Sequence, residues 1–358
     1  MGTDKQLDIL IIGGGLTGLT LAYYLRQKQI SFTILEARHR LGGRIYTREQ
    51  GNIDLGATWL GRQHTELLGL LTELNVPIFE QYLGDTAFYE PISTSPPMLV
   101  NLPDGGDPSY RIQGGTYQLI QTLADTLQLA PDHLFTGQAV RVIENREKYV
   151  VVKTDSHTFH ASCVISTLPP ALLFDKIDLQ PALPHEIVSL AATTHTWMGE
   201  SIKFGLTFPH PFWLAENVSG TVFSNPGPVP ELYDHSHHQT NTFALIGFLN
   251  GAYFSLRAEE RRELILRQLS KYYGEKVNTY LTYEELVWKN ETYTATPYSE
   301  HVLPHQDNGH PLYQQSYWNG RLFVAGTETS PKFSGYMEGA IRSAQRVLSQ
   351  LLERNQAG

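Results

Sequence analysis

The sequence has one cysteine, no basic run and no long hydrophobic segment, and each absence excludes a class of protein. Cys163 alone cannot form an internal disulfide or a multi-cysteine zinc site. The 27 Lys and Arg residues are outnumbered by 36 Asp and Glu, so a nucleic-acid or anionic-membrane surface is not expected. No apolar run approaches the ~18–20 residues that cross a bilayer. The first six residues leave no room for a secretory signal before a strand pattern begins. We therefore expect a cytoplasmic protein without a membrane anchor.

The composition that is present belongs to an ordered globular protein. Apolar residues make up 41% of the 358 residues and charged residues 18%, which excludes general disorder. At about 150 residues per domain, the length predicts two domains.

The strongest motif lies near the N-terminus. A strand-like apolar run at 7–12 leads directly into Gly13-Gly-Gly15-Leu-Thr-Gly18, a helical pattern follows, and a second strand ends at Glu36. Gly13 permits the tight turn, Gly15 lets the backbone approach a pyrophosphate, and Gly18 lets helix and strand pack closely. Glu36 can accept hydrogen bonds from ribose hydroxyls, which favours NAD or FAD over NADP. The pattern predicts a dinucleotide-binding unit.

The residues that follow favour FAD. Glu36-Ala37-Arg38, Gly43-Arg44 and Asp54-Leu-Gly56-Ala57-Thr58-Trp59 resemble, in type and spacing, signatures of the flavin-containing monoamine oxidase family. The resemblance implies an α/β fold with a GR2-type, Rossmann-like FAD-binding domain and a second, mixed α+β substrate domain. It also implies that Val140 packs near the adenine, and Arg44 can neutralise the diphosphate. From these motifs we expect FAD contacts from Gly13, Gly15, Thr17, Gly18, Glu36, Ala37, Arg38, Gly43, Arg44, Gly56, Ala57, Thr58, Trp59 and Val140.

In the rest of the chain, changes in composition and in hydrophobic pattern mark the expected segment and domain boundaries. Residues 79–110 contain five prolines and are interpreted as a loop-rich insertion. Three short strand patterns between 138 and 160 predict a β-meander. We expect a discontinuous FAD-binding domain at 1–78, 111–177 and 287–358. The substrate-binding domain would comprise 79–110 and 178–286.

Lys203 is the first candidate catalytic residue. Residues 201–208 alternate as a strand, and from the pattern alone Lys203 would lie on its solvated face. The resemblance implies a different role, because amine oxidases of this family carry a lysine in this context, linked through water to flavin N5. A buried ammonium would stabilise negative charge when the reduced flavin meets O2.

The C-terminal third supplies the aromatic candidates. Trp288 and Tyr298 lie ten residues apart, the family's spacing between a flavin-contacting Trp and the first wall of an aromatic cage. Tyr336 would be the second wall and a flavin contact. The family's C-terminal signature further implies FAD contacts from Gly326, Glu328, Gly335 and Met337. The helix that begins there can direct its N-terminal dipole at the flavin.

Two features argue against a covalent flavin bond and against a metal site. Pro297 occupies the position where mammalian-type members carry the cysteine that binds the flavin covalently, so we expect non-covalent FAD. His235, His237 and His238 lie in a polar segment without patterned carboxylates, and we interpret them as a solvated loop rather than a metal site.

The family resemblance implies an FAD-dependent oxidase that removes hydride equivalents from the Cα of a small amine, with imine hydrolysis and reoxidation by O2 to H2O2. An L-amino-acid oxidase stays open because Arg62 is close in sequence to Thr58-Trp59-Leu60, which replaces the family's usual carboxylate-clamp context. A desaturase-like or protoporphyrinogen-oxidase-like enzyme and a non-enzymatic flavin-binding protein are further alternatives. The sequence does not specify the amine or the oligomeric state.

Overall fold

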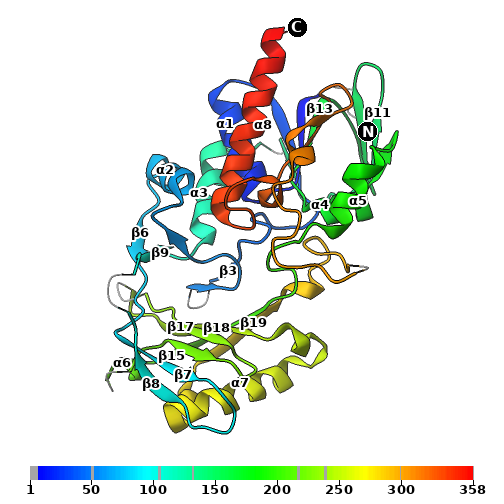
Figure 1. Ribbon diagram of the computed structural model, residues 1–358. Helices are drawn as coiled ribbons and strands as arrows, with labels where there is room; N and C mark the ends of the chain where they lie inside the picture. The colour runs from blue at the N-terminus through cyan, green and yellow to red at the C-terminus, as the bar shows by residue number, and fades with distance from the viewer. Residues whose placement is uncertain are drawn as a thin grey trace.

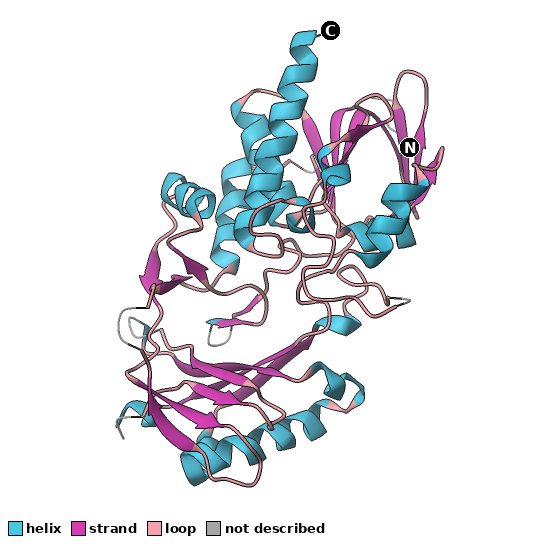
Figure 2. Cartoon of the chain, viewed as in Figure 1, coloured by secondary structure: helices cyan, strands magenta, loops and turns pink. Residues whose placement is uncertain are grey.

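A computed structural model describes residues 7–49, 52–103, 106–130, 133–215, 218–237, 240–298 and 300–357. The chain forms two layered bodies (Figures 1 and 2). One is built on a nine-stranded sheet and holds both ends of the described chain, and the other is built on a seven-stranded sheet.

The nine-stranded sheet has a parallel centre of the kind that the sequence predicts. Its main path runs β10-β2-β1-β13-β12-β11-β14, with β21 also paired to β13 and β20 to β21. β1 pairs in parallel with both β2 and β13, so the first strand lies in the interior of the sheet. The strands are β1 (Leu7–Ile12), β2 (Phe32–Leu35), β10 (Leu134–Phe135), β11 (Val140–Asn145), β12 (Val150–Thr154), β13 (Thr158–Ser166), β14 (Asp178–Gln180), β20 (Ser316–Tyr317) and β21 (Leu322–Val324).

Both faces of this sheet are covered, which explains the continuous apolar run of β1. Ile9 and Ile11 pack toward one group of helices, whereas Leu10 and Ile12 pack toward the opposite face. The first group consists of α1 (Leu16–Gln27), α2 (Thr65–Glu73), α3 (Tyr117–Leu127) and α8 (Met337–Ala357). The opposite face carries α4 (Pro170–Lys176), α5 (His185–Thr193) and the 3₁₀ turn η6 (Pro311–Gln314).

Strands β11, β12 and β13 form the antiparallel meander expected between 138 and 160. β14 then pairs in parallel with β11, so the nine-stranded sheet extends beyond residue 177. The core on this face includes Leu179, Leu183 and Ile187. The segment at 178–193 therefore packs with the nine-stranded sheet.

The seven-stranded sheet runs β19-β15-β18-β17-β16-β7-β8. Helix α7 (Ala258–Tyr273) covers one face and packs against Phe204 and Leu206 of β15. The other face is directed toward the first body (Figure 1). The strands are β7 (Thr86–Glu90), β8 (Met98–Asn101), β15 (Ile202–Phe208), β16 (Val222–Ser224), β17 (Glu231–Asp234), β18 (Phe243–Leu249) and β19 (Thr282–Val287). The short helix α6 (Phe212–Ala215) and the turns η3 (Gly251–Ser255) and η4 (Gly274–Thr279) complete this body.

The interpretation of residues 79–110 as a loop-rich insertion was wrong. This segment supplies β7 and β8, which form one edge of the seven-stranded sheet, and contributes to a smaller sheet. Pro91, Pro96 and Pro97 lie between the two strands, where no ladder N–H is needed. The prolines of the connecting turn therefore led the sequence analysis to miss the β7–β8 hairpin.

Two small sheets lie between the bodies. One pairs β3 (Thr47–Arg48) with β4 (Ile53–Asp54), and the other runs β5-β9-β6, with bounds Leu60–Gly61, Ser109–Ile112 and Ile78–Glu80. The turns η5 (Trp288–Asn290) and η7 (Thr327–Thr329) lie in the C-terminal third. Among the described helices, none is long and apolar enough to span a membrane.

A substitution at Gly18 in α1 tests whether the helix must pack closely against the β1 turn. A Cβ there would lie 2.1 Å from the backbone O of Gly13, and neither backbone can move freely. We expect Gly18→Ala to destabilise the protein by about 1–3 kcal/mol, the usual range for overpacking. Gly69→Ala in α2 is the matched control, because nothing lies within 4 Å of its Cβ position.

Helix propensity alone predicts a gain of roughly 0.5–1 kcal/mol for Gly69→Ala. Thermal and denaturant unfolding of both variants would measure the difference. Equal effects would contradict the steric argument.

Candidate active site

A cavity of about 660 Å³ is lined by residues of both bodies. Its glycine end is lined by the turn after β1 and the segments at 36–45 and 138–141. Its β-sheet end is lined by Lys203, Glu231, Tyr233 and Phe248. The predicted residues on its lining are Gly13, Gly15, Thr17, Glu36, Ala37, Arg38, Gly43, Arg44, Gly56, Ala57, Thr58, Trp59, Val140, Lys203, Gly326, Gly335, Tyr336 and Met337.

The glycine end has the form of a phosphate cradle. Gly15 and Gly43 face each other so closely that a Cβ on Gly43 would lie 3.4 Å from the Gly15 Cα. Helix α1 begins beside them, with no side-chain cap and no acidic residue in its first turn. Its N-terminal backbone N–H groups and positive dipole end are therefore available to an anion. These residues fit the diphosphate of a dinucleotide.

Glu36 is buried directly after β2 and accepts hydrogen bonds from two backbone N–H groups beside this cradle. Its Oε2 accepts from the Gly14 N–H at 2.7 Å, and its Oε1 accepts from the Arg38 N–H at 2.8 Å. A carboxylate has further lone pairs, so it can also accept from a ribose.

Both predicted arginines are paired with carboxylates. Arg44 makes a two-point ion pair with Glu328, at 2.5 and 2.8 Å. Arg38 donates to Glu291 at 3.0 Å. Glu328 is fully buried and is not on the cavity lining, so in this structure it positions Arg44.

Lys203 lies at the β-sheet end, and its side chain is buried at 1% exposure. Its Nζ donates to the backbone O of Gly56 at 2.9 Å and to the Thr58 hydroxyl, and lies 4.6 Å from the centroid of the Trp59 ring. The solvated-face alternative is therefore wrong, because the segment at 54–59 covers this face of β15. The alternation of the strand was correct, but both of its faces are buried.

The charge of Lys203 is controlled by its surroundings. Burial lowers the pKa of its ammonium to about 7, the carboxylate of Asp54 opposes that change, and the guanidinium of Arg111 adds to it. A lysine whose pKa is lowered in this way carries its proton below about pH 7 and loses it above. Lys203 can therefore change charge near neutral pH.

The aromatic residues are arranged differently from the expectation. The ring of Tyr336 stacks with Trp197 at 6.0 Å and 27° and with His305 at 6.2 Å and 9°. Tyr298 is not on the cavity lining, and its hydroxyl accepts from the Thr196 N–H at 2.6 Å. Of the two rings that stack on Tyr336, Trp197 is the one on the cavity lining, whereas the Tyr298 hydroxyl contacts the backbone of the residue before Trp197.

Trp288 and Gly18 also lie off the lining. The indole N–H of Trp288 donates to the Leu55 backbone O at 2.9 Å, which fixes the segment that leads to Gly56. Gly18 packs against Gly13, as its position in the motif predicts. In this structure both residues support lining residues.

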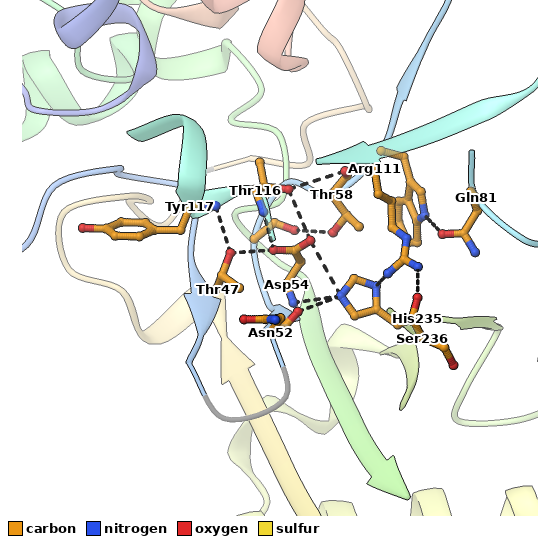
Figure 3. A network of polar contacts seen from close by, with 12 residues as sticks. Thr47, Asn52, Asp54, Thr58, Gln81, Arg111, Thr116, Tyr117, His235 and Ser236 are labelled. Atoms are coloured by element: carbon orange, nitrogen blue, oxygen red, sulfur yellow. Dashed lines mark hydrogen bonds and ion pairs between the residues drawn. The ribbon is translucent and has the colours of Figure 1, made fainter. Parts of the chain in front are cut away.

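The interpretation of 235–238 as a solvated loop was wrong for the two residues that can be judged. His235 and His237 are buried, at 0% and 5% exposure, whereas His238 lies outside the described residues. His235 belongs to a buried polar network around Asp54 and Arg111 (Figure 3). The part of the chain that the structure describes contains no group of three or more metal-binding side chains.

The sequence did not identify Glu231, Tyr233 and Phe248 as site residues. β17 and β18 place them on the cavity side, with Glu231 opposite Phe248 and Phe248 opposite Lys203. These pairings join segments separated by up to 45 residues, so no local motif marks them. The alternation Glu231-Leu232-Tyr233 was the available signal.

The fold and the cavity define an α/β protein whose glycine-lined cavity fits a dinucleotide. Residues 93–352 match the family described as flavin containing amine oxidoreductase, and residues 11–74 match an NAD(P)-binding Rossmann-like domain. The chain therefore belongs to the flavin-containing amine oxidoreductase family and is an FAD-dependent amine oxidoreductase.

Individual relatives are distant but full-length. The chain is 24% identical to amine oxidase (flavin-containing) B of Rattus norvegicus, over 98% of this chain and 86% of that protein. A putrescine oxidase structure, described as bound to putrescine, superposes with a TM-score of 0.85 at 22% identity, over 98% and 99% of the two chains. A cyclohexylamine oxidase from Brevibacterium oxydans gives 0.86 at 20%, over 98% and 100%.

Glu36 provides a test of the cofactor site. We expect Glu36→Ala to weaken FAD binding by about 1–3 kcal/mol, because the ribose acceptor and two loop contacts are lost together. Fluorescence titration of the apoprotein with FAD would measure the dissociation constant. Glu73→Ala is the control, since Glu73 is exposed and absent from the cavity lining. An unchanged affinity in Glu36→Ala would show that the ribose is held elsewhere.

Proposed function

We propose that this protein is an oxidase that transfers a hydride equivalent from the Cα of a small amine to FAD and uses O2 as the final acceptor, producing H2O2. The observation that carries the proposal is the buried Lys203 ammonium on the lining of the dinucleotide cavity. A cytoplasmic location is proposed from the sequence alone.

Bound FAD supplies the redox chemistry, by accepting the hydride equivalent and passing electrons to O2. The residues of this chain bind and orient the reactants. The glycine end and Glu36 would hold the diphosphate and ribose, and Val140 would contact the adenine. Tyr336 would orient the amine, with Trp197 in the position where Tyr298 was expected. Lys203 would supply positive charge where O2 becomes negatively charged.

The charges at the β-sheet end favour amines over amino acids. The arginines on the described cavity lining are Arg38, Arg44 and Arg141, all from segments of the glycine end. Arg62 is exposed and donates to the Tyr110 hydroxyl at 3.1 Å, away from this lining. Glu231 would repel a substrate carboxylate. An amine without a carboxylate is therefore the better substrate class.

We further propose that FAD is bound non-covalently. Pro297 offers no thiol, and the single Cys163 lies on β13, buried in the core between the nine-stranded sheet and the helices. Burial raises the pKa of the Cys163 thiol to about 12, so it stays protonated and unreactive.

Lys203→Met tests the oxidase assignment. We expect reoxidation of the dithionite-reduced holoenzyme by O2 to slow about a hundred- to thousand-fold, because a preorganised charge is removed. Stopped-flow absorbance would measure this step separately from reduction by amine. In the wild type the same rate should fall as the pH rises through about 7, where Lys203 loses its proton.

The matched control is Lys289→Met, which removes an exposed lysine that lies over the Phe254 ring. It should reoxidise at the wild-type rate. A Lys203→Met enzyme with the wild-type rate would remove Lys203 from the mechanism and favour a dehydrogenase.

Glu231→Gln tests the substrate end. Glu231 would attract a second ammonium on the substrate, and an exposed ion pair contributes about 0.2–1 kcal/mol. We expect kcat/KM for putrescine to fall about two- to five-fold relative to that for cyclohexylamine. Glu263→Gln, on α7, is the control. An unchanged ratio in Glu231→Gln would place the distal end of the substrate elsewhere.

A further inference from the structure

We propose that Glu291 is a positioning residue for the cofactor. It holds Arg38 against residues 291–296, the clasp segment, which closes the glycine end of the cavity and slows the release of FAD. The inference rests on the proposed non-covalent binding of FAD and is independent of the oxidase chemistry.

The clasp segment crosses from one body to the other. It begins shortly after Trp288, whose backbone N–H donates to the Ser201 backbone O at 3.0 Å, directly before β15 of the seven-stranded sheet. Its far end is tied to the first body, where the Thr296 hydroxyl donates to Asp175 of α4 at 2.7 Å. Between these ends, residues 292–294 lie on the cavity lining. The segment therefore bridges the two bodies along the wall of the cavity.

Arg38 joins the clasp segment to the glycine end. Its Nε and Nη2 donate to one carboxylate oxygen of Glu291, at 3.2 and 3.0 Å. Nη2 also donates to the Thr294 hydroxyl at 2.7 Å, and Nη1 donates to the Tyr293 backbone O at 3.4 Å. Within the described chain these contacts use four of the five guanidinium donors, which leaves one N–H of Nη1 to donate to the cofactor.

The backbone of Arg38 is fixed at the residue expected to hold the ribose. Its N–H donates to Oε1 of Glu36 at 2.8 Å, and its O accepts from the Gly137 N–H at 2.9 Å. Glu36 and Arg38 both lie on the cavity lining. Because the backbone of Arg38 is held at the ribose acceptor, the clasp segment can leave the glycine end only when its contacts with the guanidinium break.

The contact between Arg38 and Glu291 is sheltered from solvent. The two side chains are 12% and 28% exposed, and Thr294 beside them is buried. Hydrogen bonds between a guanidinium and a carboxylate are stronger than neutral ones, and partly buried pairs are screened less by salt than exposed pairs. A glutamine at 291 keeps the shape of the side chain but loses its charge, so Glu291→Gln weakens the contact with little change in packing.

A competing role makes the opposite prediction. If Glu291 withheld Arg38 from the cofactor diphosphate, removal of its charge would free the guanidinium for FAD and slow the release. The direction of the change in the release rate therefore distinguishes a clasp from a competitor.

The test is the rate at which FAD leaves the Glu291→Gln holoenzyme. We expect release to be about ten- to a hundred-fold faster than from the wild type, as for the loss of a charge-assisted contact. The holoenzyme is diluted without amine into an excess of apo-glucose oxidase, which traps FAD. The activity that the trap enzyme regains measures the released cofactor.

Glu284→Gln is the matched control. Glu284 pairs with Arg48 at 3.0 Å and is 23% exposed, and neither residue lies on the described cavity lining. This variant should release FAD at the wild-type rate. In an Arg38→Met background, Glu291→Gln should add little, because Glu291 acts through Arg38.

Thermal unfolding of the apoproteins separates the clasp from a general loss of stability, since Glu291→Gln and Glu284→Gln should unfold at similar temperatures. If Glu291→Gln does not fold, Thr294→Val removes only the hydroxyl that accepts from Arg38 and should still accelerate release.

Three results would overturn the inference: release at the wild-type rate, slower release, or an equal acceleration in the Arg38→Met background. Acid denaturation of the wild type separates this inference from the proposed mode of binding. Flavin that stays with the precipitated protein would contradict both non-covalent binding and the clasp. Flavin that is fully released, together with one release rate in all variants, would overturn the clasp alone.

Discussion

The buried bond from the Lys203 ammonium to the Gly56 carbonyl is the interaction on which the cavity depends. Lys203 belongs to the seven-stranded sheet, and Gly56 follows the Asp54 strand that lies between the bodies. A Cβ on Gly56 would lie 2.2 Å from the Arg44 backbone O, so this segment fits only with glycine there. The glycine that receives the lysine thus also packs against the arginine at the glycine end. One short segment couples the substrate-facing sheet to the dinucleotide site.

Burying that ammonium has a cost that the surrounding polar groups must offset. Two acceptors satisfy part of its hydrogen-bonding capacity, and the face of Trp59 adds a cation–π contact at 4.6 Å. Trp59 is held in turn by Gln81, whose Oε1 accepts from the indole N–H at 3.1 Å. An ordinary surface lysine needs none of this. The arrangement holds a charge in a confined site, where electrostatic effects are larger than in water.

The sequence identified the parts of the site that are local in the chain. The Gly13–Gly18 turn and Glu36 interact across only about twenty residues of sequence. The local sequence alone therefore explains why these positions carry glycine and an acid. His235 could not be interpreted in this way. Its burial depends on Arg111 and Asp54, which are 124 and 181 residues away. The same holds for Arg44, whose partner Glu328 is 284 residues distant, and for the 79–110 hairpin, whose strand β7 pairs with β16.

The distribution of charge along the cavity gives its two ends different chemistry. The arginines on the described lining belong to the segments that would hold the anionic diphosphate, and two of them are already paired with buried or half-buried carboxylates. At the β-sheet end the lining residues are aromatic, with Lys203 and Glu231 two strands apart in one row. Adjacent strands are about 4.8 Å apart, so these two charges are separated by roughly 10 Å across the ring of Phe248. This surface between a cation and an anion is the basis of our proposal that the substrate is an amine with a hydrocarbon body and without a carboxylate.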